Sequence, residues 1–192
     1  MGSGRGALRV IGGSLRGRRL LTPRGDRIRP TGDRVREALF DILGDRIRGA
    51  VFLDAYAGTG AVGVEALSRG AGFAVFVERD PEAVELIRRN LDSLRESAGR
   101  ARLIGRDLAA AVALLETEGV RFDVVYLDPP WSGGELDRGL RLIGTGRILS
   151  HAAVVVAEHD AASEPPGGGA LKLLRTRSYG RAGLTFYAAT HR

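Results

Sequence analysis

The sequence has no cysteine and few other metal-binding or nucleophilic side chains. Its 192 residues include three histidines, His151, His159 and His191, and a single lysine, Lys172. Without cysteine the chain can form no disulfide and can perform no thiolate chemistry. The histidines are not spaced as ligands of one ion, so we predict neither a zinc site nor any other metal site.

Long hydrophobic runs are also missing. The longest, such as residues 152–157, are much shorter than the roughly 20 apolar residues that cross a bilayer. Residues 1–6 lack the apolar centre of a signal peptide. These absences predict a cytoplasmic protein with no membrane partner. The length fits one domain with a substantial core, and we expect a monomer.

Positive charge is concentrated at the N-terminal end. The first 36 residues hold ten arginines and two acids, a net charge of +8, whereas the whole chain carries +6, so the remainder sums to −2. Such a concentration is typical of a surface that binds phosphate groups, although a solvated basic face is the simpler alternative. Contact with nucleic acid is predicted for Arg9, Arg16, Arg18, Arg19 and Arg29.

Short apolar pieces at residues 8–11 and 18–21 flank glycines, which predicts a small antiparallel hairpin outside the main fold. After it, Thr31 can cap a helix whose apolar residues recur at helical spacing and which ends at Gly44 or Gly49. From residue 51 onward, strand and helix patterns alternate. The expected strands are 51–54, 73–78, 101–105, 122–127 and 153–158, and the expected helices are about 60–69, 81–96, 108–117 and about 134–143.

Such alternation calls for a mostly parallel sheet with helices on both faces. Two further strands, 171–175 and 184–188, follow one another without a helix between them. The whole pattern is the outline of the α/β, Rossmann-like class I methyltransferases that use S-adenosylmethionine, with a seven-stranded sheet ending in an antiparallel hairpin. We expect residues 1–30 to form a basic β-hairpin extension and residues 31–192 the methyltransferase domain.

A glycine-rich turn at residues 53–63 follows the first strand of this pattern. Gly58, Gly60 and Gly63 also satisfy the G-x-G-x-x-G pattern of dinucleotide sites, so the glycines alone are ambiguous. Asp54 separates the two readings, because an acid opposes a pyrophosphate but favours the cationic ammonium and sulfonium of S-adenosylmethionine. The predicted cofactor-binding residues are Asp54, Ala57, Gly58, Gly60, Gly63, Glu78, Asp107 and Thr31.

Acids end four successive strands of the pattern, at Asp54, Glu78, Asp107 and Asp128. Glu78 is placed to bind a ribose, and Asp107 to accept a hydrogen bond from the adenine amine. Asp107 is equally well placed to cap the helix that follows it. Their recurrence along one edge of a sheet is more specific than any single acid and predicts a ligand site there.

The four residues Asp128, Pro129, Pro130 and Trp131 come directly after an apolar strand. The acid can accept hydrogen bonds from an exocyclic amine, the prolines fix the backbone, and the indole offers a face on which a base can stack. This combination predicts methyl transfer to a nucleobase nitrogen, with these four residues as the catalytic group.

Three segments together, residues 29–40, 54–70 and 128–131, resemble the RsmD-like family of 16S rRNA guanine-N2 methyltransferases. Residues 9–20 and 177–187 resemble the termini of that family, so the resemblance spans nearly the whole chain. It implies S-adenosylmethionine as cofactor, the small ribosomal subunit as partner and guanine 966 as the target. The family would have phenylalanine or tyrosine where this chain has Trp131, and stacking survives that change.

The resemblance places Thr31 and Asp33 in a segment that closes over the site. Arg34 and Arg36 either contact RNA phosphate or pair with carboxylates of the site. Asp128 and the Pro129 carbonyl would accept the two hydrogens of the guanine amine and localise its lone pair, while the flipped base stacks on Trp131. The alternatives are methylation of a DNA adenine or another RNA guanine, a non-catalytic RNA-binding assembly factor and, more distantly, a nicotinamide dehydrogenase.

Overall fold

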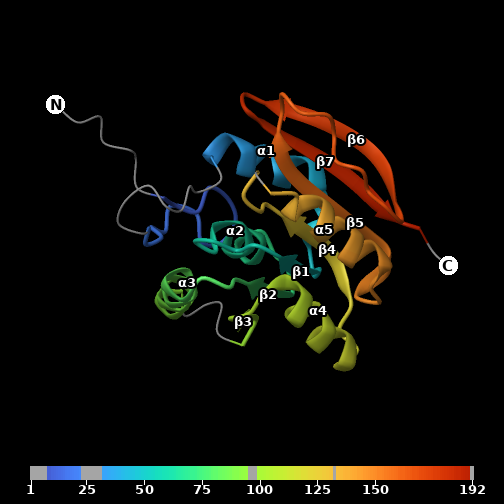
Figure 1. Ribbon diagram of the computed structural model, residues 1–192. Coiled ribbons are helices and arrows are strands. Elements are labelled where there is room, and N and C mark those ends of the chain that lie inside the picture. The colour runs from blue at the N-terminus through green and yellow to red at the C-terminus, as the bar shows by residue number, and fades with distance from the viewer. Residues whose placement is uncertain (1–7, 23–31, 95–98, 132, 191–192) are drawn as a thin grey trace.

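The computed structural model describes residues 8–22, 32–94, 99–131 and 133–190, and it contains one seven-stranded sheet (Figure 1). The strand order is β3-β2-β1-β4-β5-β7-β6. Strands β1 to β5 pair in parallel, and β7 joins β5 and β6 in antiparallel pairing. This confirms the predicted sheet. The strands are β1 (Val51–Asp54), β2 (Phe73–Val77), β3 (Ala101–Ile104), β4 (Phe122–Leu127), β5 (Leu149–Asp160), β6 (Leu171–Tyr179) and β7 (Ala182–Ala189).

Helices cover both faces of the sheet, and each face has its own apolar core (Figure 1). The helices are α1 (Asp33–Leu43), the 3-10 turn η1 (Gly44–Ile47), α2 (Ala61–Ser68), α3 (Pro81–Ser93), α4 (Leu108–Thr117) and α5 (Glu135–Thr145). Helices α1, α2 and α3 pack on one face, and α4 and α5 on the other. Because both faces are covered, the central strands are almost entirely buried, as their continuous apolar sequences require.

Local sequence signals explain where most elements begin. Helix α3 starts at Pro81 because the Asp80 carboxylate accepts hydrogen bonds from the backbone N–H groups of Glu82 and Ala83, at 2.8 and 3.0 Å. Its predicted end was too late, since the helix stops at Ser93. Strand β5 begins at Leu149, earlier than predicted, because a register shift opposite Phe122 and Val124 lets residues before 153 join the sheet.

Residues 8–22 fold back on themselves as a hairpin, but without the two predicted strands, and they pack on the main fold instead of lying outside it. A single antiparallel bridge pairs Arg9 with Arg19. The apolar side chains between its arginines belong to the same core as α1 and α2, and they are Leu8, Val10, Leu15 and Leu20. Alternate residues of the hairpin therefore divide between a buried apolar side and an exposed basic side.

The beginning of α1 also differs from the sequence prediction. Gly32 is its N-cap residue, and no side chain caps the helix. The predicted capping and cofactor residue Thr31 lies outside the described residues, as does Arg29. The helix ends at Gly44, one of the two predicted positions. None of the helices in the described ranges is long and apolar enough to span a bilayer.

Candidate active site

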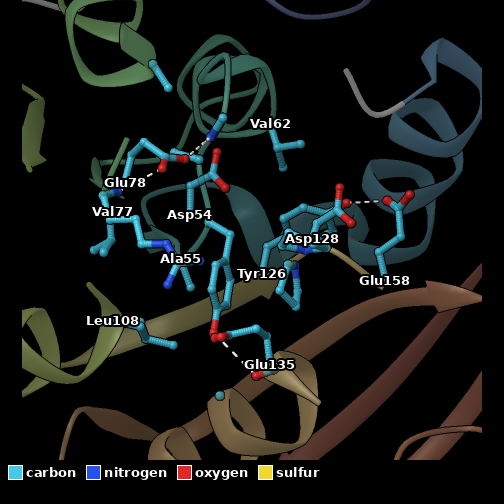
Figure 2. A pocket seen from close by; sticks show the side chains of 18 of the residues that line it. Asp54, Ala55, Val62, Val77, Glu78, Leu108, Tyr126, Asp128, Glu135 and Glu158 are labelled. Carbon is cyan, nitrogen blue, oxygen red and sulfur yellow. Dashed lines mark hydrogen bonds between the residues drawn. The ribbon is translucent and has the colours of Figure 1, made fainter. Parts of the chain in front are cut away.

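A cavity of about 900 Å³ opens at the carboxyl edge of the sheet. This edge is where open α/β sheets bind ligands, and the volume lies in the upper part of the usual range of roughly 300–1,000 Å³. Figure 2 shows Asp54 and Glu78 on one side of the cavity and Asp128 and Glu158 on the other. Most of the predicted site residues line it together, namely Asp54, Ala57, Gly58, Glu78, Asp107, Asp128, Pro129, Pro130 and Trp131.

Asp54 is the last residue of β1 and is almost completely buried at the floor of the cavity. Its Oδ2 accepts a hydrogen bond from the Gly63 N–H at 2.9 Å. Burial raises the pKa of the Asp54 carboxyl from 3.8 to about 7; the Gly63 N–H works against this shift, and the negative charge of Glu78 adds to it. An acid held this way has a strong electrostatic preference for a cationic ligand.

The glycine turn has two functions that the sequence pattern did not separate. Gly58 lines the cavity, and its φ of +54° is a conformation that favours glycine. Gly60 and Gly63 do not line the cavity. Gly60 is the left-handed N-cap of α2. At Gly63 a Cβ atom would lie 2.2 Å from the Phe76 ring, so the helix can pack on β2 only with glycine there. Direct cofactor contact is therefore not supported for either of these two glycines.

Glu78 holds the glycine turn against the end of β2. Its Oε2 accepts a hydrogen bond from the Gly58 N–H at 2.9 Å. Its Oε1 accepts from the backbone N–H groups of Arg79 and Asp80 at 2.8 and 2.9 Å. Three backbone donors thus fix the carboxylate at the rim of the cavity, where it can accept further hydrogen bonds from ligand hydroxyls.

Asp107 combines the two functions that the sequence left open. It caps α4 by accepting a hydrogen bond from the Ala110 N–H at 2.8 Å, and it also lines the cavity. A carboxylate has acceptor capacity for about four hydrogen bonds, so capping the helix does not exhaust it. The residue is therefore held in place by the helix while it faces the same space as Asp54.

The segment Asp128–Trp131 follows β4 at the same edge. Pro129 is buried and fixes the backbone beside the cavity, while Asp128 is partly buried and lines it. Trp131 is 41% exposed and also lines the cavity. A tryptophan so exposed is not part of a core. Its indole is instead placed at the mouth, where the face of a planar ligand can rest on it.

Several residues of the cavity were not predicted. Tyr126 lies two residues before Asp128 on β4 and donates a hydrogen bond to Glu158 Oε2, and both side chains are buried and line the cavity (Figure 2). A contact between two strands cannot be read from the sequence of either strand alone. Arginines also surround the mouth, which extends the basic surface beyond the N-terminal segment: Arg79, Arg106, Arg138 and Arg181.

The predicted RNA-binding arginines separate into exposed and buried groups. Arg9, Arg16, Arg18, Arg19 and Arg34 are exposed. The prediction of RNA contact was wrong for Arg36, whose side chain is 0% exposed. Its Nη2 donates to the Arg9 carbonyl at 2.8 Å and to Asp33 at 2.9 Å.

Arg36 also lies near the buried Glu65 of α2, with 4.0 Å between its Nε and Glu65 Oε2. Neither Asp33 nor Glu65 lines the cavity. These two ion pairs therefore do not support the alternative prediction, that Arg36 pairs with carboxylates of the site. The residue joins the hairpin to α1 and α2.

The basic hairpin lies along α2 and ends beside the glycine turn. Near the far end of the helix, the Ser68 side chain accepts a hydrogen bond from the Leu15 N–H at 2.9 Å. At the start of α2, Asn90 of the neighbouring helix α3 joins the hairpin to the glycine turn. It accepts a hydrogen bond from the Leu21 N–H at 2.7 Å and donates one to the Thr59 carbonyl at 3.0 Å. Since Thr59 lines the cavity, one end of the hairpin lies near it.

Known proteins resemble this chain over nearly its whole length. The family model described as Conserved hypothetical protein 95 matches residues 8–188. A Bacillus subtilis (strain 168) protein named "Putative rRNA methyltransferase YlbH" is 36% identical over 181 residues, 94% of this chain and 98% of the relative. "Ribosomal RNA small subunit methyltransferase D" of Escherichia coli (strain K12) is 38% identical over 164 residues, 85% of this chain and 80% of that protein.

A solved structure shows the same architecture. The structure titled "Putative methyltransferase yhhF from Escherichia coli" superimposes with a TM-score of 0.83 at 32% sequence identity. The similarity covers 96% of this chain and 98% of that one. The N-terminal hairpin, the parallel sheet and the final antiparallel strands therefore all fall within the shared region.

Proposed function

The chain belongs to the family described as Conserved hypothetical protein 95, the RsmD-like family that its motifs indicate, and from this we propose that it methylates the N2 amine of a guanine in 16S ribosomal RNA. The predicted class I methyltransferase fold is confirmed, and S-adenosylmethionine is the cofactor. Methylation of small-subunit ribosomal RNA follows from the named relatives. The N2 atom and the target guanine 966 are the finer part of the proposal.

One observation carries the proposal: the predicted cofactor residues and the predicted target-base residues line the same cavity. The acids Asp54, Glu78 and Asp107 lie at the ends of β1, β2 and β3, and Asp128 follows β4 next to them in the sheet. A cofactor and a base can therefore lie side by side at this edge. Such positioning is the main requirement of a displacement reaction.

The residues present fit S-adenosylmethionine. Asp54 offers a buried negative charge for a cation, Glu78 offers a fixed carboxylate for ribose hydroxyls, and Asp107 offers an acceptor for the adenine amine. Gly58 leaves the wall between them free of a side chain. When bound, the cofactor supplies an electrophilic methyl group on a sulfonium.

The protein's own contribution is to make the guanine amine nucleophilic and to hold it in line. The N2 lone pair is delocalised into the ring, so the neutral amine is a poor nucleophile. Asp128 and the Pro129 carbonyl accept its two hydrogens and localise the lone pair on nitrogen, while Trp131 supports the ring from its face. S-adenosylmethionine, held by Asp54, Glu78 and Asp107, would supply the methyl group to the nitrogen and be left as S-adenosylhomocysteine, and the methylated amine would give one proton to Asp128 or to solvent.

The assay that tests the proposal uses unmodified small ribosomal subunits, purified protein and methyl-labelled S-adenosylmethionine. After digestion of the RNA, the labelled nucleoside is identified by mass spectrometry. A single N2-methylguanosine is expected, at position 966. Label in N6-methyladenosine would assign a different nucleobase amine, and no label despite measured cofactor binding would favour the non-catalytic assembly factor.

The raised pKa of Asp54 predicts that cofactor affinity depends on pH. Below about pH 7 the free protein holds this carboxyl largely protonated, whereas a cationic ligand favours the ionised form. Binding therefore releases a proton, and the dissociation constant of S-adenosylmethionine is expected to rise by up to about tenfold for each pH unit below 7. Isothermal titration calorimetry between about pH 5.5 and 7.5, in two buffers of different ionisation enthalpy, measures both the affinity and the released proton.

The matched variant for this measurement is Asp54→Asn. It keeps the size of the side chain and removes the titration, so its affinity is expected to be weaker at pH 7.5 and nearly independent of pH. A wild-type affinity that is flat over the same range would contradict the assignment of Asp54 to the cation.

Trp131 is expected to contribute to RNA binding and not to folding. Trp131→Ala should raise the Michaelis constant for the subunits in line with the loss of about 1–3 kcal/mol of stacking. Trp131→Phe keeps a stacking face and should recover most of this loss. Because the side chain is 41% exposed, the free energy of unfolding in urea should change by less than about 0.5 kcal/mol. A large loss of stability with an unchanged Michaelis constant would show instead that Trp131 acts in packing.

A further inference from the structure

We infer that Glu158 reads the guanine: its carboxylate accepts the N1–H of the target base and thereby separates guanine from purines that lack this hydrogen. This inference rests on the proposed function and adds to it a residue that determines base specificity. It depends on three observations, which are the burial of Glu158 in the cavity wall, its hydrogen bond with Tyr126 and its place beside Asp128 in the sheet.

Glu158 lies near the end of β5 and lines the cavity, yet it is only 5% exposed. A buried carboxylate is costly unless hydrogen-bond donors compensate for the lost water. The Tyr126 hydroxyl donates one hydrogen bond to Oε2. Since a carboxylate can accept about four hydrogen bonds, the Tyr126 bond orients the group without exhausting its acceptor capacity. Tyr126 is in this respect a positioning residue.

The register of the sheet places Glu158 beside Asp128. Tyr126 pairs with Val156 and Leu127 pairs with Ala157, so the next position along the parallel strands sets Asp128 against Glu158. Neighbouring strands lie about 4.8 Å apart. Because side chains alternate between the faces of a strand, Tyr126, Asp128 and Glu158 belong to one face of the sheet. Two carboxylates of the same face therefore border one end of the cavity (Figure 2).

Two carboxylates on neighbouring strands of one face repel each other when both are ionised, and donors from a ligand relieve the repulsion. The Watson–Crick edge of guanine presents such donors next to each other, the N2 amine and the N1–H. With Asp128 on the amine, the neighbouring acceptor that this edge requires is Glu158. Adenine carries a lone pair at N1, which a carboxylate repels, and so does cytosine at N3. Sites that pair a base donor in this way reject analogues without it strongly.

The test uses small subunits reconstituted around RNA that carries either guanine or 2,6-diaminopurine at the target position. Diaminopurine keeps the N2 amine but has a lone pair at N1. The wild-type protein is expected to methylate guanine about 100-fold faster than diaminopurine in single-turnover reactions. In Glu158→Gln the amide can donate to N1 of diaminopurine, so the ratio should fall to about tenfold or less, with a faster absolute rate on diaminopurine.

Comparing ratios between variants cancels the intrinsic reactivity of the two bases. Glu158→Asp retains the charge but moves the carboxylate away from the base. It should therefore slow the methylation of guanine without accelerating the methylation of diaminopurine. Tyr126→Phe retains the buried ring and removes only the hydroxyl, so the ratio should fall several-fold. All three should keep the wild-type affinity for S-adenosylmethionine. The control is Asp160→Asn, two residues along the same strand and outside the cavity lining, which should leave the ratio unchanged.

The outcomes separate this inference from the function on which it rests. If wild-type protein forms no N2-methylguanosine on guanine-bearing subunits, both fall. If it forms that product and Glu158→Gln keeps the wild-type ratio, only the inference about Glu158 falls. If Glu158→Gln does not fold, Tyr126→Phe decides: a reduced ratio supports the assignment, and an unchanged ratio overturns it.

Discussion

Replacing Asp128 by alanine is expected to lower the turnover number by a factor on the order of 10² to 10⁴, the usual contribution of a positioned group that handles a proton. The variant loses the acceptor that localises the N2 lone pair. It keeps the cofactor side of the cavity, because Asp54, Glu78 and Asp107 are held by backbone donors of their own. The affinity for S-adenosylmethionine should therefore stay within about twofold of the wild-type value. Single-turnover rates and calorimetry measure the two quantities separately.

The matched variant is Asp128→Asn, in which the amide oxygen still accepts one hydrogen from the amine. Its turnover number should lie between those of the wild-type protein and Asp128→Ala. Equal loss of turnover and of cofactor affinity in the alanine variant would remove Asp128 from its proposed place at the target base. An unfolding transition at the wild-type temperature is the check that the fold is intact.

Neutralising the exposed arginines of the hairpin is expected to have the second largest effect, on RNA affinity. The triple variant Arg16→Gln, Arg18→Gln, Arg19→Gln removes three candidate phosphate contacts. Each contact contributes about 0.7 to the slope of log K against log salt, so affinity for the small subunit at 0.1 M salt should fall by about 100-fold and the slope should decrease by about 2. Cofactor affinity should not change, since none of the three residues lines the cavity. Filter binding over a series of salt concentrations gives both the affinity and the slope.

The control for this experiment is a second triple variant that loses the same three positive charges. Its arginines lie at the amino ends of the strands, opposite the site. Arg46, Arg121 and Arg147 are exposed and precede β1, β4 and β5, whose carboxyl ends form the site. Replacing them by glutamine should leave the salt slope within about 0.5 of the wild-type slope. If both triple variants lose the same affinity for the small subunit, the hairpin is not a specific RNA-binding surface. RNA affinity then depends only on the total charge of the protein.

The elements of the fold could be predicted from the sequence because their signals are local. Asp80 and Pro81 indicate the start of α3, and the continuous apolar run of β4 indicates a strand that is buried on both faces. The candidate site followed from the same logic. Acids that end successive parallel strands must meet at one edge, so the order of strands and acids along the chain is enough to bring Asp54, Glu78, Asp107 and Asp128 together.

What could not be predicted depends on contacts between distant segments. Arg36 has the same local sequence character as Arg34, yet one is buried against the hairpin and the other is exposed. Glu158 ends the predicted fifth strand, 153–158, just as the other acids follow theirs, but its importance depends on the register with β4 and on Tyr126. Likewise, the sequence of the hairpin shows apolar residues but not that they pack against α1 and α2, which only the folded structure reveals.

The burial of the hairpin's apolar side has a consequence for how such enzymes can diverge. An RNA-binding element that is attached only by a flexible linker can be lost, gained or exchanged without destabilising the catalytic domain. Here Leu8, Val10, Leu15 and Leu20 are part of the main core, and each buried side chain of this kind contributes about 1.5–3 kcal/mol. Removing the hairpin would expose apolar side chains of α1 and α2 and is expected to destabilise the fold. Its exposed arginines can change without disturbing this packing, while its inward face must change together with the helices that it covers.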